Sequence, residues 1–355
     1  MGTIFLILIL VLGFLIVFQI AKANEYVSVL KGEKKTFEQN NRINGFMMIV
    51  FLVLGLIAVY WCNELFKGKI LGEAASDHGK KIDQMLYLTL AITGVVFFIT
   101  QILLFWFAFK YQYSEKRKAY YYPHNNKLEV IWTVIPAIFL TVLVGFGLYY
   151  WFKITGEAPK NSLIVEVTGK QFAFIGRYPG KDNTFGRKYY KNITDVDNNE
   201  LGMDWSDNAG HDDVIVAGTE IYVVKNRPVK IVINSRDVVH DVGLPHFRMK
   251  MDAVPGTPTV MWFTPLYTTA EMKEKLKKPD FVYEISCDQM CGSSHYTMRG
   301  IINVVTQPEY DLWMAKQKSK YTQVNEAKQP AQPAPAKDST VKATAVTAPV
   351  GSVNN

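Results

Sequence analysis

Residues 286–299 combine sulfur and imidazole groups within one short stretch. Cys287 and Cys291 are four positions apart, His295 follows four positions later, and Met298 three positions after that. Thiolate and thioether ligands select soft metals such as copper(I), while imidazole suits copper and zinc. Zinc sites are built from cysteine, histidine and carboxylate ligands, and iron–sulfur clusters usually take four cysteines. The stretch therefore predicts a copper site.

The second cysteine extends this prediction. A single-copper electron-transfer site needs one cysteine, two histidines and a weak axial methionine. An additional thiolate allows two bridging sulfurs and a second metal atom. The missing histidine must then come from another part of the fold, and the strongest candidate is His240, which follows the strand-like run Val229–Asn234.

These residues resemble the dinuclear CuA domain of cytochrome c oxidase subunit II. The resemblance comprises His240, the run Met251-Asp252-Ala253-Val254-Pro255-Gly256, and the pattern Cys-x3-Cys-Gly-x2-His-x2-Met. Upstream, residues 129–136 resemble the start of the family's second transmembrane helix, and residues 169–174 resemble its aromatic segment. Because the matches follow the family order, the resemblance covers the chain from about residue 85 to about residue 306.

The resemblance implies a ligand set and an activity. In the family both cysteines bridge the two copper atoms; one copper is completed by the first histidine and the methionine, the other by the second histidine and a backbone carbonyl. The corresponding residues are His240, Cys287, Gln289 (through its carbonyl), Cys291, His295 and Met298. The implied function is subunit II of a proton-pumping cytochrome c oxidase, which accepts electrons from cytochrome c. The electrons pass to haem a in subunit I, whose haem a3–CuB centre reduces oxygen to water.

Three positions bear on the details of that function. Gln289 stands where the family commonly has a glutamate that helps to bind magnesium at the subunit I interface. Phe172 stands where the family often has the tryptophan that receives the donor's electron, so it is the candidate residue for electron acceptance. Glu129 aligns with a glutamate near the mouth of a proton channel; it is either a proton collector or a solvated carboxylate.

The positive charge of the chain is explained by a membrane location. The chain has 355 residues and a formal net charge of +7, but its lysines and arginines lie mainly in loops that flank apolar runs. A nucleic-acid partner is therefore not expected. Four apolar runs are near the length of about 20 residues that crosses a bilayer: Ile4–Ile20, Phe46–Cys62, Leu86–Phe109 and Val130–Phe152.

Loop charges weakly favour one orientation, with the first and third loops inside. Positive residues number five, four and five in the three loops, and the more positive loops face the cytoplasm. Both termini and the copper domain are then outside, as expected for a multi-pass protein of the bacterial inner membrane with a periplasmic domain. The alternative is that the first run is a signal peptide cleaved near Ala21-Lys22-Ala23. Two points favour an uncleaved span. No positive residue precedes the apolar run, and cleavage would leave three spans, which would place the copper domain inside.

The second half has the two-residue period of strands. Strand-like runs separated by turn residues predict a small antiparallel sandwich: 163–167, 214–217, 220–224, 229–234, 259–263, 281–286 and 300–306. The cysteine loop is expected between the last two of these strands, an arrangement that resembles cupredoxins. The fold class expected is a membrane-anchored α + β protein, transmembrane helices followed by a cupredoxin-like antiparallel β-sandwich. Residues 268–279 are expected to form a short helix or a lid-like insert.

The chain divides into four expected parts. These are an N-terminal extension with two spans (1–84), a helical hairpin (85–158), the extracytoplasmic copper domain (159–317) and an Ala/Pro/Lys-rich tail expected to be disordered (318–355). An acidic insertion, residues 195–213, either steers a basic donor or is a solvated loop. The implied partners are subunit I, other oxidase subunits, a cytochrome c or an equivalent haem c donor, and the membrane.

Other functions fit the sequence less well. A copper carrier would expose a readily exchanged ligand pair, whereas six convergent ligands favour retention of the metal. A nitrous oxide reductase resembles the same copper loop but brings a large further domain. A quinol oxidase subunit lacks the copper cysteines. A structural Cys287–Cys291 disulfide would leave the nearby histidines and methionine unexplained.

Overall fold

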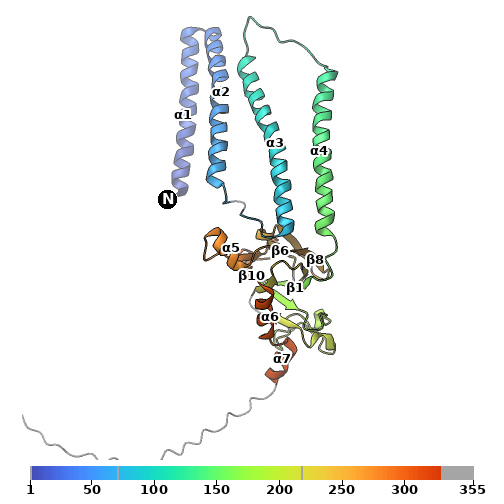
Figure 1. The fold of residues 1–355 in the computed structure, drawn as a ribbon. Coiled ribbons are helices and arrows are strands. Elements are labelled where there is room, and N and C mark those ends of the chain that lie inside the picture. Colours follow the sequence, from blue (N-terminus) through green and yellow to red (C-terminus); the bar gives the residue numbers. More distant parts are fainter. Residues whose placement is uncertain (1, 70–71, 217–218, 329–355) are drawn as a thin grey trace, which may run out of the picture. The chain divides into compact units, whose positions relative to one another are not determined.

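The computed structural model describes residues 2–69, 72–216 and 219–328 (Figure 1). It divides into two compact units, one formed by Met1–Gly176 with Val216–Leu312 and the other by Arg177–Ile215 with Trp313–Asn355. The long helices and most strands belong to the first unit.

Four long helices occupy the N-terminal part of the chain: α1 (Gly2–Lys31), α2 (Glu33–Phe66), α3 (Asp77–Lys110) and α4 (Asn126–Thr155). Among the described residues, α2, α3 and α4 are long and apolar enough to cross a membrane. A helix of 34 residues, such as α3, extends about 51 Å, which exceeds the roughly 30 Å hydrocarbon core. Three of the four predicted spans lie inside these helices. The fourth, Ile4–Ile20, lies in α1, where residues 1–10 fall outside the described side chains.

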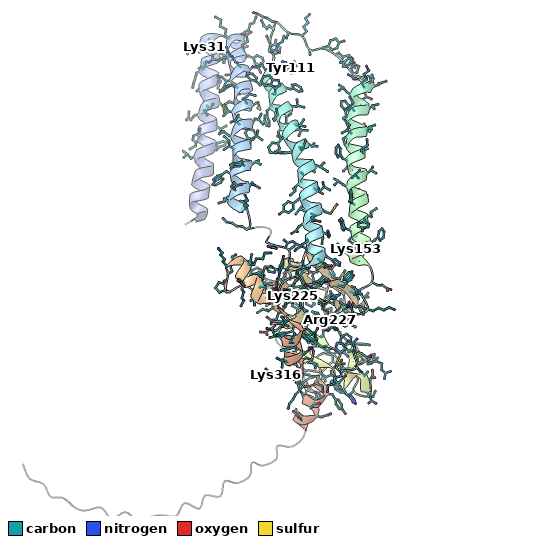
Figure 2. The ribbon with its side chains drawn as sticks, viewed as in Figure 1. Lys31, Tyr111, Lys153, Lys225, Arg227 and Lys316 are labelled. Atoms are coloured by element: carbon teal, nitrogen blue, oxygen red, sulfur yellow. The ribbon has the colours of Figure 1, made fainter. Side chains whose placement is uncertain are left out.

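Side chains project from these helices on all sides (Figure 2). Their apolar side chains are largely exposed along α3 and α4, as expected for surfaces that face lipid or other apolar helices rather than water. Polar contacts join α2 to the segment that follows α3. Asn41 Nδ2 donates to the carbonyl of Tyr113 at 2.7 Å, and Lys34 pairs with Glu115 at 2.8 Å.

The start of α3 is fixed to the β domain within the first unit. The Ser76 side chain caps the helix by accepting from the Gly79 N–H at 2.8 Å, and it donates to the carbonyl of Phe247 at 2.7 Å. Arg248 pairs with Asp83 at 2.9 Å. The predicted boundary after residue 84 thus falls inside α3. The reason is that the first two turns of α3 are polar and precede the apolar run.

Ten strands form two five-stranded sheets. One has the order β3-β2-β1-β5-β8 and the other β4-β10-β9-β6-β7. The strands are β1 (Leu163–Lys170), β2 (Ala173–Tyr178), β3 (Val214–Val216), β4 (Glu220–Val224), β5 (Val229–Ser235), β6 (His240–Leu244), β7 (Met249–Ala253), β8 (Thr259–Phe263), β9 (Tyr283–Ser286) and β10 (Arg299–Val305). Fully buried side chains from both sheets form the core, among them Val165, Ile231, Val242 and Phe263.

The pairing is mixed rather than wholly antiparallel. β1 runs parallel to β5, from Leu163 opposite Val229 to Gly169 opposite Ser235, and β10 runs parallel to β4. Antiparallel registers join β5 with β8, β6 with β7, β6 with β9 and β9 with β10. Parallel neighbours arise because long connections, not hairpins, join these strands.

Three strands were not expected from the sequence pattern. The β6 strand is buried at every position and β2 at every position after the first, so neither shows the alternation that marks a half-buried strand. β7 begins one residue after a Pro-containing 3₁₀ turn (Pro245–Phe247), whose sequence is typical of a loop. The predicted short helix within 268–279 is α5 (Thr269–Leu276), which begins with a capping box between Thr268 and Glu271.

The second unit contains the insertion after β2 and the C-terminal helices, α6 (Gln307–Ala315) crossing its boundary. Arg177 donates to Asp213 and to the carbonyl of Gly186, and both charged side chains are almost fully buried. Two further 3₁₀ turns lie here, Tyr190–Asn192 and Asn208–Gly210.

The tail was expected to be disordered from residue 318, but its first part is helical in the structure. Residues Lys320–Lys328 form helix α7. The Tyr321 ring stacks on His211 at 3.8 Å, and Lys318 pairs with Glu326 at 2.9 Å. Tyr321 thus supplies a packing contact that the Ala/Pro/Lys-rich composition does not reveal. Residues 329–355 lie outside the described part of the chain.

Candidate metal centre

The loop that carries the two cysteines, the ligand loop, connects two neighbouring strands. β9 ends at Ser286 and β10 begins at Arg299, and these two residues lie opposite each other in the ladder. The Cys287 N–H donates to the carbonyl of Met298 at 3.1 Å, which closes the base of the loop. The predicted position of the cysteine loop, between the last two strands, is confirmed. The adjacent strand β6 brings its first residue, His240, to the same place.

The two cysteine sulfurs lie close together without forming a disulfide. Both thiols are free and buried, and the two Sγ atoms are 3.8 Å apart. A disulfide bond requires about 2.05 Å. The sulfur–sulfur distance is therefore too long for the alternative in which Cys287 and Cys291 form a structural disulfide.

Nitrogen and thioether atoms flank the sulfurs. His240 Nδ1 lies 3.9 Å from Cys287 Sγ, and His295 Nδ1 lies 3.7 Å from Cys291 Sγ. Met298 Sδ is 3.9 Å from Cys291 Sγ. The carbonyl oxygen of Gln289 is 3.1 Å from Cys287 Sγ. The structure thus brings all six predicted ligand residues to one site.

His240 and the two cysteines form the tightest part of this group. Their ligand atoms lie within 4.8 Å of one another and all three residues are buried; this is the one such group found among the described residues. Metal–sulfur bonds are near 2.3 Å in the related case of zinc, so two sulfurs 3.8 Å apart can contact the same metal atom. Soft sulfurs with imidazole and carbonyl donors on either side fit a copper pair.

Burial changes the proton affinity of the thiols. The pKa of Cys291 is raised to about 11, chiefly because burial disfavours the thiolate, and further by its hydrogen bond with Cys287. Without metal this thiol is therefore protonated at neutral pH. Since the ligand is the thiolate, metal binding must displace a proton from the site.

His240 is held by contacts on both sides of its ring. Its side chain is fully buried against β1, where a Cβ on Gly169 would lie 2.9 Å from the imidazole Cδ2. Its Nε2 lies 2.7 Å from Asp237 Oδ1. Burial opposes the charge of Asp237, but hydrogen bonds from the Gln171 N–H and from His240 hold the pKa of its carboxyl below the usual value.

Asp237 and Gln171 are residues whose contacts the sequence did not reveal. Asp237 contacts the His240 ring, with its Oδ1 2.7 Å from Nε2. The Asp-x-x-His spacing is a signal that could have found this contact. Gln171 has no comparable signal, since its partners are backbone groups and a carboxylate distant in sequence.

Phe172 lies against the ligand loop and is half-buried. A Cβ on Gly292 would lie 2.8 Å from Phe172 Cζ, and Gly292 has a φ of 143°, which favours glycine. Gly292 follows the ligand Cys291 directly. The aromatic residue thus touches the backbone beside a ligand, which suits the predicted role in electron acceptance.

Glu129 lies in the first turn of α4 and has a structural contact. Its Oε1 accepts a hydrogen bond from the Asn125 N–H at 3.3 Å, and the Asn125 side chain accepts from Leu128 N–H at 3.1 Å. These bonds satisfy donors at the helix start. Glu129 is exposed and is distant in sequence from the metal ligands. Its contact among the described residues is with Asn125, not with a ligand.

Comparison with known proteins identifies the family. The family model described as "Cytochrome C oxidase subunit II, transmembrane domain" matches residues 65–149, and "Cytochrome C oxidase subunit II, periplasmic domain" matches residues 164–305. An alternative cytochrome c oxidase subunit 2 from Bradyrhizobium diazoefficiens is 32% identical over 238 residues, covering 67% of this chain and 80% of the relative. A cytochrome c oxidase subunit 2 from Cereibacter sphaeroides is 25% identical, covering 64% and 73%.

A solved structure is also similar. The crystal structure of the periplasmic domain of subunit II of cytochrome oxidase of Bradyrhizobium japonicum is 25% identical, covers 46% of this chain and 99% of that chain, and superposes with a TM-score of 0.32. The two family models cover both halves of the chain, and they confirm the predicted fold class, apolar helices followed by a cupredoxin-like β domain. The chain therefore belongs to the cytochrome c oxidase subunit II family.

Proposed function

We propose that this chain is the electron-accepting subunit of a proton-pumping cytochrome c oxidase in a bacterial inner membrane. A dinuclear copper centre held by the chain would take electrons from cytochrome c and deliver them to haem a of subunit I. One observation carries this proposal: two buried, unbridged sulfurs 3.8 Å apart, each with an imidazole nitrogen within 4 Å.

The resemblance to the family divides the ligands between two metal positions. Cys287 and Cys291 would be shared, His240 and Met298 would complete one position, and His295 with the Gln289 carbonyl would complete the other. A copper pair of this kind supplies one-electron transfer with the charge spread over both metals. The chain's own contribution would be a fixed cage, because the ligand residues lie at the start of β6 and in the loop between β9 and β10, which are neighbours in one sheet.

The chain also supplies surfaces for a donor and for the other subunits. Beside the ligands, Val238, Val239, Met290 and Tyr296 expose apolar side chains. Exposed apolar residues that cluster around a site favour contact with a protein partner. We assign Phe172 as the residue that receives the donor's electron, because it touches the backbone beside Cys291. The acidic insertion would attract a basic cytochrome c or an equivalent haem c donor.

Two features concern protons and magnesium. Glu129 remains a candidate proton collector at the cytoplasmic end of α4, although its carboxylate also caps that helix. Gln289 exposes its side chain, so an amide oxygen is available to a magnesium ion at the subunit I interface. An amide carries no charge, and it would bind that ion less strongly than the glutamate common in the family.

The proposal is tested by Cys291→Ser in the assembled oxidase. Serine removes the second bridging sulfur, so the complex should lose one or both of its subunit II coppers and stop oxidising cytochrome c, while its haems remain bound. Ser293→Ala, in the same loop, is the matched control. Wild-type copper content and oxidation rate in Cys291→Ser would contradict the proposal. Rapid loss of copper from the wild type to a mild chelator would favour a carrier instead.

A further inference from the structure

Asp237 lies in the turn between β5 and β6, and its carboxylate contacts three neighbouring groups. Oδ1 accepts from the Val238 N–H at 2.7 Å and contacts His240 Nε2 at 2.7 Å. Oδ2 accepts from the Gln171 N–H at 2.8 Å. The turn itself is closed by the Ser235 hydroxyl, which donates to the carbonyl of Val238. A carboxylate that accepts from two backbone N–H groups and contacts one imidazole nitrogen is held in one orientation.

The contact with His240 determines which ring nitrogen faces the sulfurs. When Nε2 donates its proton to Asp237, Nδ1 carries the free lone pair, and Nδ1 is the atom that points toward Cys287 Sγ. Metal-bound histidines usually donate their other N–H to such a group, which fixes the tautomer and makes the ligand more basic. The geometry thus pre-orients His240 for metal binding.

Gln171 extends this arrangement to the opposite side of the site. Its backbone N–H donates to Asp237, and its side-chain Nε2 donates to the carbonyl of Cys291 at 2.6 Å. One residue therefore joins the turn that carries His240 to the loop that carries the cysteines. Gly292 leaves room for this connection, because a Cβ there would lie 3.0 Å from Gln171 Nε2.

We infer that Asp237 is a positioning residue of the copper centre and that Gln171 couples it to the cysteine loop. This inference rests on the proposed function, since it assigns a role toward the copper that His240 would bind. Asp237 fixes the His240 ring and places a negative charge behind it. Gln171 holds the two ligand-bearing segments at a constant separation, and it does so from the position next to Phe172.

Loss of Asp237 should change both affinity and redox equilibrium. Removal of a partner of this kind typically lowers metal affinity 10–100-fold. The negative charge behind His240 also stabilises the oxidised, more positive form of the centre. Its removal should therefore shift the equilibrium toward the reduced form, so the reduction potential should rise. A residue with a purely structural role would not move the potential in this defined direction.

The test uses the assembled oxidase with Asp237→Asn and Gln171→Ala. Asparagine retains one oxygen for the imidazole and the Val238 N–H but loses the charge and the acceptor for Gln171. Alanine at 171 keeps the backbone N–H that donates to Asp237 and removes only the bond to Cys291. The matched control is Asp280→Asn, which removes one exposed carboxylate elsewhere in the same unit. Copper content under a graded chelator, the EPR spectrum and the reduction potential are measured for each.

We expect Asp237→Asn to lose copper at chelator concentrations 10–100-fold lower than the wild type, with a raised potential and a changed EPR spectrum. Gln171→Ala should change the EPR spectrum and weaken retention to a smaller degree, and it keeps the inference testable if Asp237→Asn does not assemble. Wild-type affinity and potential in both variants would overturn the inference while leaving the copper function intact. A wild-type complex without subunit II copper would instead overturn the proposed function.

Discussion

Phe172 is the residue through which the proposed electron path meets the surface. The ring is half-buried and lies against Gly292, the neighbour of the ligand Cys291. Replacement by alanine removes this ring without touching any ligand side chain. We expect Phe172→Ala to slow the reduction of the copper centre by reduced cytochrome c several-fold, with unchanged copper content. Stopped-flow absorbance measures the rate.

Phe172→Trp is the matched control for this prediction. It keeps an aromatic surface at the same position, so its rate should remain near that of the wild type. Equal rates for Phe172→Ala and the wild type would show that the donor's electron arrives elsewhere. Trp205, in the acidic insertion, would then be the next residue to replace.

The ligand residues were predictable from the sequence, but their supports were not. The spacing of Cys287, Cys291, His295 and Met298 shows the metal chemistry because all four lie in one loop. His240 was found from its place after a strand and from the family pattern. Asp237 lies only three residues before His240, a spacing that could have revealed their contact. Gln171 had no such signal, because its contacts join groups that are distant in sequence. Such contacts depend on the packing of β1 against β5.

The insertion between β2 and β3 depends on one buried ion pair. Asp213 is fully buried, and Arg177 Nη2 lies 2.5 Å from its Oδ2. Burial raises the pKa of Asp213, and Arg177 opposes that effect. Arg177→Ala would leave this carboxylate without its charged partner, which costs about 3–5 kcal/mol in buried pairs.

Unfolding by urea, followed by tryptophan fluorescence, measures this cost. Arg187→Ala is the control, since Arg187 pairs with Asp204 and Asp207 while 72% exposed. Exposed pairs contribute about 0–1 kcal/mol, so this variant should remain close to the wild type. A similar small loss in Arg177→Ala would show that the ion pair does not stabilise the insertion.

The strands most visible in the sequence are those with one exposed face. β5 alternates buried and half-buried positions, and its predicted range is nearly the observed one. β6 is buried throughout, and its glycine and the proline after it resemble a loop. The parallel pairs could not be inferred either, because pairing partners depend on long-range packing rather than on local sequence.

At the scale of the whole chain, the orientation of the helices can be tested with introduced cysteines. The predicted topology places the loop between α2 and α3 outside and the loop between α3 and α4 inside. In a Cys62→Ala background, Lys67→Cys should react with a membrane-impermeant maleimide in intact spheroplasts. Lys116→Cys, the matched control, should react only after the membrane is permeabilised. Both positions are exposed.

The opposite labelling pattern would contradict this topology. It would require the copper domain to lie on the cytoplasmic side, or the number of spans before it to be different. The sequence predicted the three described spans well, since about 20 consecutive apolar residues leave few alternatives. Loop charges were less decisive, because the three loops carry nearly equal numbers of basic residues.

The copper content and EPR spectrum of the purified, full-length chain in its oxidase complex test the central claim most directly. Two copper atoms should be bound by this chain, with one unpaired electron shared equally between two copper nuclei in the partly oxidised form. Copper removal should abolish that signal and lower the melting temperature, because a ligand that binds only the folded state stabilises it. A single copper atom, a zinc ion, or an electron confined to one nucleus would contradict the account.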